Sequence, residues 1–369
     1  MNILLTAFGD PDNPKTWSKT PYAIKEILRK DNVVETFDMS KLKTSGISLF
    51  QKFLGKMRIA GSHLTRSPFI YKFYSNGLEK VLADTKMDVV LFAAEHCLGT
   101  NKKRKVKCYE YIDCLLRPIY DVDPSTNLIQ RLTLPLYERN DKKSFQEMDM
   151  IFTLTEWVRI KIIQDYGISP EKVKNVGFGV NLKPYYGSKD YEQKRLLIVL
   201  RKGMEYRKGL PLLLEAFKII KATIPNATLD IVGTEGPSYP GVTYYYNQSR
   251  DVTVNLFQKC TLYTMPAIYE PCGNTYLEAL ANRAPIVGLN RFAIPEFTGN
   301  GKWGFIANEE KPEAVANVII DALSDIERLK EMGEAGQKFV IENYTWEIAV
   351  KKMLDYIKQD ISNGKIDKA

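Results

Sequence analysis

The chain has 369 residues, 44% of them hydrophobic, which is too large for one core and favours two α/β domains of about 150–180 residues each. A charged fraction of 26%, with a moderate net charge of +8, excludes long disordered stretches, and no apolar run reaches the roughly 18–20 residues that cross a bilayer. Five scattered cysteines without a Cys-x-x-Cys pair predict reduced thiols, so we expect a cytoplasmic protein, at most in contact with the inner face of a membrane.

The first half alternates short runs rich in β-branched residues with segments of helical periodicity, the pattern of βαβ units in a parallel sheet. Helical segments such as PYAIKEILRK and EWVRIKIIQDYG lie between the runs. A polar stretch at 183–194, with Pro, Gly and Ser, then predicts a linker. Six strands are expected, at residues 2–8, 33–39, 88–94, 106–112, 150–155 and 173–179.

The second half restarts the alternation, and from Lys311 onward it predicts helices throughout. Five further strands are expected, at 195–201, 227–233, 242–246, 261–267 and 285–290. The whole pattern predicts an α/β fold with two Rossmann-like, doubly wound parallel sheets. The expected domains are residues 1–182, residues 183–345, and a closing helix at 346–369 that packs back on the first domain.

Two basic segments leave alternatives open. Residues 101–107, NKKRKVK, contain five basic residues and no acidic one, which fits a solvated loop or a contact with an anionic acceptor or membrane phosphate equally well. Residues 49–74 mix Lys and Arg with apolar side chains, and we favour packing against a sheet over an anionic membrane surface. Without interleaved aromatic residues, the signal for nucleic-acid binding is weak.

The most informative string is MPAIYEPCGNTYLEALANRAPIVGLN, which predicts a strand, a loop and a helix. Free amides and the positive dipole end at the start of that helix favour an anion such as a diphosphate. Gly273 lets the backbone approach closely, and Asn274 and Thr275 offer amides and side-chain donors. Glu278 can accept hydrogen bonds from two vicinal hydroxyls, while Glu270 lies on the preceding loop.

This string resembles the retaining glycosyltransferases of family 4, whose E-x7-E signature corresponds to Glu270 and Glu278 in EPCGNTYLE. LRKGMEYRKGLPLLLEAF is similar to the phosphate-binding stretch of that family, with Arg201 and Lys208 as the residues that grip the pyrophosphate. LDIVGTEG and DYGISPEKVKNVGFGVNLKPY extend the resemblance over nearly the whole chain. It implies the GT-B fold, in which two Rossmann-like domains face each other across a cleft.

The resemblance implies a retaining, metal-independent transferase that takes a hexose from a nucleotide-diphosphate sugar and uses no cofactor. Negative charge that builds on the leaving diphosphate would be stabilised by Arg201, Lys208 and helix-terminal amides. Attack from the front face implies no protein nucleophile, so Glu270 would hold sugar hydroxyls. The acceptor would be a sugar, a lipid or a small molecule. The pair Asp121 and Asp123 is interpreted as a helix-entry device and not as a metal motif.

The N-terminal domain is expected to supply the acceptor side. Relatives carry a glycine pair after the first strand, whereas this chain has the single Gly9, and Lys19 stands where similar sequences have glycine, so phosphate would meet Lys19. Asp113, after the strand ending in YEYID, is the leading catalytic candidate of this half. His96 is the second, with a structural hydrogen-bonding role equally open.

For three further features of the C-terminal half we favour structural roles over functional ones. Residues 244–246, three tyrosines, lie where the family places the strand before the base pocket, but sheet packing is favoured. Glu296 matches a Pro-Glu turn of the family and is expected to cap or brace that turn, with Trp303 packed beside it.

Other function classes compete with transfer. A GT-B sugar-nucleotide epimerase would share the architecture but would need further acid and base groups at the anomeric centre. A dinucleotide-binding oxidoreductase is disfavoured because TAFGDPDNP lacks the G-x-G-x-x-G turn. A non-catalytic nucleotide-sugar-binding protein stays open because of Lys19 and the missing glycine pair.

Overall fold

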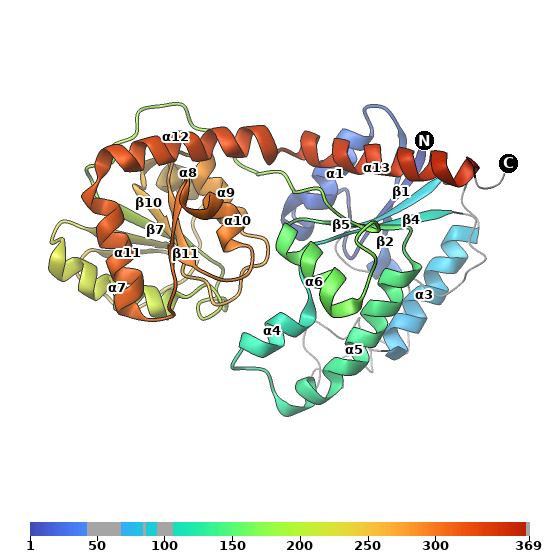
Figure 1. The fold of residues 1–369 in the computed structure, drawn as a ribbon, viewed down its shortest axis with the longest axis horizontal. Helices are drawn as coiled ribbons and strands as arrows, with labels where there is room; N and C mark the ends of the chain where they lie inside the picture. Colours follow the sequence, from blue (N-terminus) through green and yellow to red (C-terminus); the bar gives the residue numbers. More distant parts are fainter. Residues whose placement is uncertain (43–67, 84–85, 94–105, 367–369) are drawn as a thin grey trace. The chain divides into compact units, whose positions relative to one another are not determined.

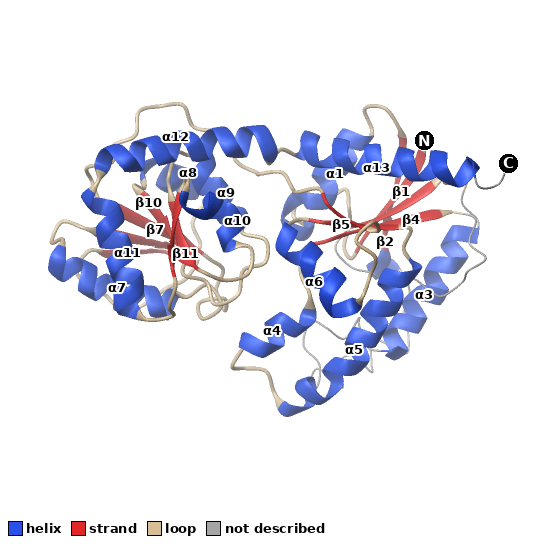
Figure 2. Cartoon of the chain, in the orientation of Figure 1, coloured by secondary structure: helices blue, strands red, loops and turns tan. Residues whose placement is uncertain are grey.

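The computed structural model describes residues 1–42, 68–83, 86–93 and 106–366 (Figure 1). The chain divides into an N-terminal unit, Met1–Gly177 with Trp346–Ala369, and a C-terminal unit, Phe178–Thr345. Within the described residues, each unit contains one six-stranded parallel sheet covered by helices (Figure 2). The prediction of two Rossmann-like parallel sheets is therefore confirmed.

The six strands predicted for the first half all form, each within a few residues of its expected ends. They are β1 (Asn2–Ala7), β2 (Val33–Asp38), β3 (Val89–Ala93), β4 (Lys107–Ile112), β5 (Met150–Thr153) and β6 (Val173–Asn175), in the spatial order β2-β1-β3-β4-β5-β6. The register pairs Ile3 with both Val34 and Val89. The order changes direction between β1 and β3, and ligands of open parallel sheets bind at such switch points.

Helices cover both faces of the N-terminal sheet. They are α1 (Thr20–Leu28), α3 (Pro68–Ala83), α4 (Leu116–Val122), α5 (Leu128–Glu147), α6 (Glu156–Tyr166) and α13 (Trp346–Ile366), with short 3-10 turns at Thr16–Lys19 and Met39–Lys41. Figure 1 shows α1 and α13 on one face and α3, α5 and α6 on the other. Asp360 of α13 accepts a hydrogen bond from Tyr109 of β4 at 2.7 Å, so the last helix packs on this unit.

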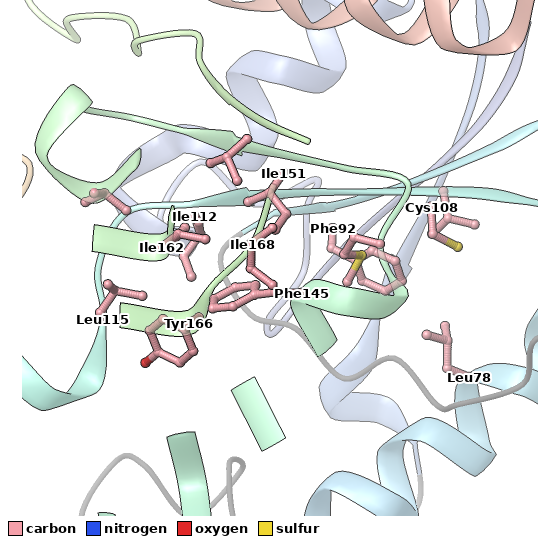
Figure 3. Close-up of a cluster of buried hydrophobic side chains, with 14 of the residues drawn as sticks. Leu78, Phe92, Cys108, Ile112, Leu115, Phe145, Ile151, Ile162, Tyr166 and Ile168 are labelled. Carbon is pink, nitrogen blue, oxygen red and sulfur yellow. The ribbon is translucent and has the colours of Figure 1, made fainter. Parts of the chain in front are cut away.

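The core of the N-terminal unit lies between its sheet and the helices α3, α5 and α6 (Figure 3). Phe92 and Ile112 project from β3 and β4, and Phe145 and Ile162 meet them from α5 and α6, all fully buried. Parallel strands covered on both faces carry continuous apolar runs, and this is why β3 reads VVLFA.

The C-terminal sheet contains the five predicted strands and one that the sequence analysis missed. Its strands are β7 (Arg195–Val199), β8 (Thr228–Val232), β9 (Val242–Tyr245), β10 (Leu262–Thr264), β11 (Ile286–Leu289) and β12 (Gly304–Ala307), in the order β12-β11-β10-β7-β8-β9. The missed strand, β12, is a four-residue edge strand that opens on a glycine, so it offers little periodicity to detect. The order changes direction between β7 and β10, which makes their carboxyl ends the switch point of this unit.

The helices of the C-terminal unit also lie on both faces of its sheet (Figure 1). They are α7 (Leu210–Thr223), α8 (Arg250–Lys259), α9 (Asn274–Ala281), α10 (Ile294–Thr298), α11 (Pro312–Ser324) and α12 (Ile326–Asn343), with a 3-10 turn at Gly299–Gly301. Residues 183–194, predicted as a linker, contain no helix or strand and lie on this unit. There the Lys189 ammonium donates to the carbonyls of Phe257, Gln258 and Asn282, at the ends of α8 and α9.

Several predictions fall wholly or mostly outside the described residues. They concern His96, most of the basic segment 101–107, and residues 49–67 of the mixed segment 49–74. The described end of that segment begins α3, and its Tyr74 is buried in the core of the N-terminal unit. None of the helices in the described ranges is long and apolar enough to cross a membrane.

Candidate functional site

Two loops meet at the switch point of the C-terminal sheet. The first, 200–209, connects β7 to α7, and the second, 265–273, connects β10 to α9. The backbone carbonyl of Arg207 accepts hydrogen bonds from the amides of Ile268 and Tyr269 at 2.9 and 3.2 Å. The guanidinium of Arg207 also lies over the Tyr269 ring, 4.9 Å from its centroid. These contacts hold the two loops together where ligands of such sheets bind.

Each of these loops contains a glycine that no other residue can replace, and Gly209 allows the two loops to approach closely. Gly209 has a φ of 73°, and a Cβ there would lie 1.9 Å from the carbonyl oxygen of Pro266 on the other loop. Gly273 has a φ of 60°, and a Cβ there would lie 2.6 Å from the Phe297 ring. Since any larger residue would be strained and would clash, glycine is required at both positions.

The centre of the site is an ion pair between Lys208 and Glu270, one from each loop. The other oxygen of the Glu270 carboxylate accepts hydrogen bonds from the amides of Gly273 and Cys272, at 2.8 and 3.2 Å. Glu270 is only 6% exposed. Burial by itself would raise the pKa of Glu270, but the Lys208 charge and the two amides outweigh it, and the pKa lies below its ordinary value. The carboxylate is therefore ionised and held firmly in place.

The start of α9 lies directly beyond this carboxylate. Gly273 is its N-cap residue and provides no side-chain cap. In the described part of the chain, the backbone amides of Asn274 and Thr275 have no acceptor. Such amides and the helix dipole attract an anion. The Thr275 hydroxyl contacts the Met265 sulfur at 3.8 Å, so that side chain points back toward β10.

Glu278 lies on the second turn of α9 and is 9% exposed. Its carboxylate accepts a hydrogen bond from the guanidinium of Arg250, the first residue of α8, at 3.2 Å. Burial raises the pKa of Glu278, and the Arg250 charge offsets this in part, so the pKa lies above its ordinary value. A buried carboxylate with one partly exposed partner is costly for the fold, which is typical of a functional residue.

Arg201 follows β7 by two residues and is exposed. Its carbonyl accepts a hydrogen bond from the amide of Met204, which closes a turn in the loop that also carries Lys208. The structure thus places both predicted cations on one loop, with Lys208 anchored by Glu270.

At the switch point of the N-terminal sheet, the predicted site residue Asp113 contacts the loop after β1. Asp113, one residue after β4, accepts a hydrogen bond from the Trp17 indole N–H at 3.2 Å. The Trp17 ring packs edge-on against Tyr111, with 5.9 Å between centroids. Gly9, in the same loop after β1, donates its amide to Asp38 at 3.0 Å. The loop after β1 and the end of β4 are therefore joined by Trp17.

The residues that lead into α1 are strained. Trp17, Ser18 and Lys19 have φ values of 38°, 53° and 73°, so three consecutive residues that are not glycine adopt the left-handed conformation. That conformation costs roughly 1–2 kcal/mol for a residue with a Cβ, and such strain concentrates at ligand-binding sites. Lys19 is also the N-cap residue of α1.

Replacing Lys19 with glycine is expected to raise the free energy of unfolding by about 0.5–1 kcal/mol. Glycine relieves the left-handed strain in the folded state, and the greater flexibility that it gives the unfolded chain offsets part of this stabilisation. Urea unfolding of K19G measures the effect. Lys15, at a φ of −84°, provides the control, and K15G should be slightly less stable than the parent. A K19G variant no more stable than the parent would contradict the strain argument.

The interpretation of Asp121 and Asp123 as a helix-entry device is wrong. Asp121 and Asp123 do not begin a helix: Asp121 lies in α4, and Asp123 ends α4 and accepts bonds from the Ser125 amide and hydroxyl. The following helix is instead capped by Asn127, whose carboxamide oxygen accepts from the Gln130 amide. Among the described residues, no group of three or more His, Cys, Asp and Glu side chains is arranged to hold a metal ion.

The Glu296 carboxylate, on α10, accepts a hydrogen bond from the Tyr344 hydroxyl at 3.2 Å, which braces this turn. Trp303 donates to the carbonyl of Phe297 and stacks on Phe339, so it braces the end of α10. Tyr246 is 39% exposed beside edge strand β9, where Lys202 lies over its ring.

The sequence analysis missed Arg250, Arg207 and Trp17. Arg250 precedes a helix and resembles any other surface cation in sequence. Trp17 carried a detectable signal, since a tryptophan in a polar loop after the first strand of an α/β sheet is unusual for a solvent-facing position.

Two Rossmann-like parallel-sheet units, each with loops gathered at its switch point, define the GT-B class of fold. Solved structures agree with this. The chain resembles sucrose-phosphate synthase from Thermosynechococcus elongatus with a TM-score of 0.72 and 13% identity, over 98% of this chain and 100% of that one. It resembles WaaG, a glycosyltransferase involved in lipopolysaccharide biosynthesis, with a TM-score of 0.67 and 14% identity, over 97% and 99% of the two chains.

Residues 188–339, within the C-terminal unit, match the family model of glycosyl transferases group 1. Spore coat protein SA of Bacillus subtilis is 26% identical over 244 residues, which span 57% of this chain and 65% of that relative. The MMP alpha-(1->4)-mannosyltransferase of Mycolicibacterium hassiacum is 21% identical over 309 residues, 78% and 75% of the two chains. The match to the first of these relatives covers less than two thirds of its length, and membership of the retaining family 4 stays a prediction.

Proposed function

We propose that this protein is a retaining, metal-independent glycosyltransferase that moves a hexose from a nucleotide-diphosphate sugar to a hydroxyl group. The observation that carries the proposal is the Lys208–Glu270 pair at the switch point, directly before the open amides of α9. It lies within the residues that match the glycosyl transferases group 1 model. We assign the donor to the C-terminal unit and the acceptor side to the N-terminal unit.

The chemistry follows from where charge develops. When the bond between the anomeric carbon and the phosphate breaks, negative charge builds on the leaving diphosphate. Lys208 is fixed by the buried Glu270 carboxylate, so its ammonium group needs little reorganisation to meet that charge. Arg201, on the same loop, and the amides of Asn274 and Thr275 add further donors. These cations and amides supply the stabilisation that a divalent metal supplies in other transferases.

The two carboxylates serve different parts of the donor. Glu278, buried on α9 beside Arg250, is proposed to accept hydrogen bonds from the vicinal hydroxyls of the ribose. Glu270 retains one oxygen on Lys208 and can accept from hydroxyls of the transferred hexose. No protein nucleophile is assigned, because front-face attack uses the departing phosphate oxygen as the base. In the N-terminal unit Asp113, oriented by Trp17, is proposed to act on the acceptor side, where Lys19 and Gly9 lie in the strained loop.

A panel of UDP-, GDP- and ADP-sugars tests the proposal by release of the nucleoside diphosphate. One donor is expected to release its diphosphate in the presence of a sugar, lipid or small-molecule acceptor, and proton NMR of the product should show the donor's anomeric configuration. A donor at a hundred times its Kd should also stabilise the protein by about 2.7 kcal/mol. Stabilisation without release for any donor and acceptor would favour a non-catalytic nucleotide-sugar-binding protein, and an altered sugar without transfer would favour an epimerase.

A further inference from the structure

Helix α5 carries aliphatic side chains in solvent on its outward face. Leu128, Leu132, Leu136 and Ile129 are 71%, 69%, 50% and 42% exposed. Of the nine large hydrophobic side chains that are exposed in the described part of the chain, these four fall within nine consecutive residues of one helix. Single exposed leucines are ordinary, but a contiguous group marks an interaction surface. We call these four residues the α5 stripe.

The stripe belongs to a well-anchored helix. Leu128, Leu132 and Leu136 are four residues apart, so they lie along one face. The opposite face buries Leu134 and Phe145, and Phe145 lies in the core of the N-terminal unit (Figure 3). At the N-terminus Asn127 and Gln130 form a reciprocal capping box, and Arg117 of α4 forms a two-point ion pair with Glu138. The exposure of the leucines is therefore a property of the folded helix and not of a frayed end.

Basic side chains continue the same face toward the C-terminus of α5. At 100° per residue, Arg139 and Lys143 lie in line with the leucines, and Lys142 and Arg131 flank that line. All four are exposed, and none forms an ion pair with a described residue. Glu138 is engaged with Arg117. The outward face is thus apolar over its first half and cationic over its second.

We infer that the α5 face docks on the surface of an anionic lipid bilayer, with the stripe among the acyl chains and the cations on lipid phosphates. A bilayer interface presents apolar and anionic material side by side, as this face requires. A second copy of the chain fits less well. Antiparallel α5 helices would set leucines against cations, and parallel ones would set four cations against four cations. The proposal goes beyond the proposed transfer reaction and does not depend on it.

Sedimentation with vesicles of phosphatidylglycerol and phosphatidylcholine tests the surface on the full-length protein. The parent should bind vesicles rich in phosphatidylglycerol, bind pure phosphatidylcholine weakly, and dissociate as salt rises. L132Q/L136Q should weaken binding by about tenfold or more, and R139Q/K143Q by roughly 25-fold at low salt, about fivefold per charge. Glutamine keeps helix propensity, so the thermal midpoint should not move.

Ile160, which is 40% exposed on α6, provides the matched control, and I160Q should bind vesicles as the parent does. The inference is overturned if the parent does not bind phosphatidylglycerol vesicles, or if L132Q/L136Q binds them equally well. A dimer in sedimentation velocity that L132Q/L136Q abolishes, without vesicle binding by the parent, would assign the face to a second copy instead. Because the assay needs no donor, its failure leaves the proposed transferase activity untouched.

Discussion

Replacing Lys208 with methionine is expected to lower the free energy of unfolding by about 3–5 kcal/mol and the transfer rate by about 10²–10³-fold. The stability loss arises because the buried Glu270 carboxylate keeps its charge without its cation. The rate loss arises because the leaving diphosphate loses a fixed positive charge. Urea unfolding and diphosphate release at saturating donor measure the two effects.

The double variant K208M/E270Q separates them. Removing the stranded charge should recover most of the stability, since both partners are then neutral, while activity stays as low as in K208M. Lys202 is the matched control on the same loop, because its ion pair with Glu235 is exposed on both sides, so K202M should be about as stable as the parent. If K208M were as stable as K202M, Lys208 would not compensate the buried carboxylate.

The difference between parent and K208M should depend on pH. In the folded parent the pKa of Glu270 lies below its ordinary value, so the stability that this pair contributes is fully present above about pH 4.5 and is lost as pH falls through the lowered folded pKa. K208M lacks that contribution at every pH. The two unfolding free energies should therefore differ most at neutral pH and converge in acid.

Replacing Glu278 with glutamine is expected to raise the free energy of unfolding at neutral pH and still impair function. Burial raises the pKa of Glu278 in the folded state. Between about pH 4.5 and this raised pKa, Glu278 is therefore protonated in the folded state and ionised in the unfolded state. Stability therefore falls as pH rises through this window, and the charge is unfavourable at neutral pH. E278Q removes it and should gain about 1 kcal/mol at pH 7.5, with no gain below pH 4.

Donor binding should weaken in the same variant. A hydrogen bond between a charged group and a hydroxyl contributes about 1.5–3 kcal/mol, so kcat/KM for the donor should fall by roughly 10–150-fold. Glu215, exposed on α7 beside Lys218, provides the control, and E215Q should change neither quantity. The claim is falsified if E278Q binds the donor as the parent does, and the pKa argument fails if E278Q is the less stable protein at pH 7.5.

Eleven of the twelve described strands could be predicted from sequence, since runs such as VVLFA in β3 and LLIV in β7 have the composition of buried parallel strands. The failures have local causes. The four residues of β12 begin on glycine, and Asp123 ended a helix where a helix start was expected because an Asx turn and a cap have the same composition.

The candidate site was predicted as residue types and not as contacts. Glu270, Gly273 and Glu278 lie close in sequence, so one string revealed them. The partners of the two carboxylates did not appear in it, because Lys208 is 62 residues from Glu270 and Arg250 is 28 from Glu278. The same holds for Trp17, 96 residues from Asp113, and for the strain at residues 17–19.

The sequence alone determined the α/β alternation and eleven of the twelve described strands, and it predicted the anion-binding chemistry of the loop before α9, because periodicity and residue type are local properties. Only the tertiary structure decided which loops meet and which side chains remain uncovered. Lys208 reaches Glu270 because β10 crosses over to lie beside β7, and this order depends on the packing of helices far apart in the chain. In the same way, the apolar period of α5 gives two candidate faces, and only the neighbours of the folded helix decide that Leu132 faces water.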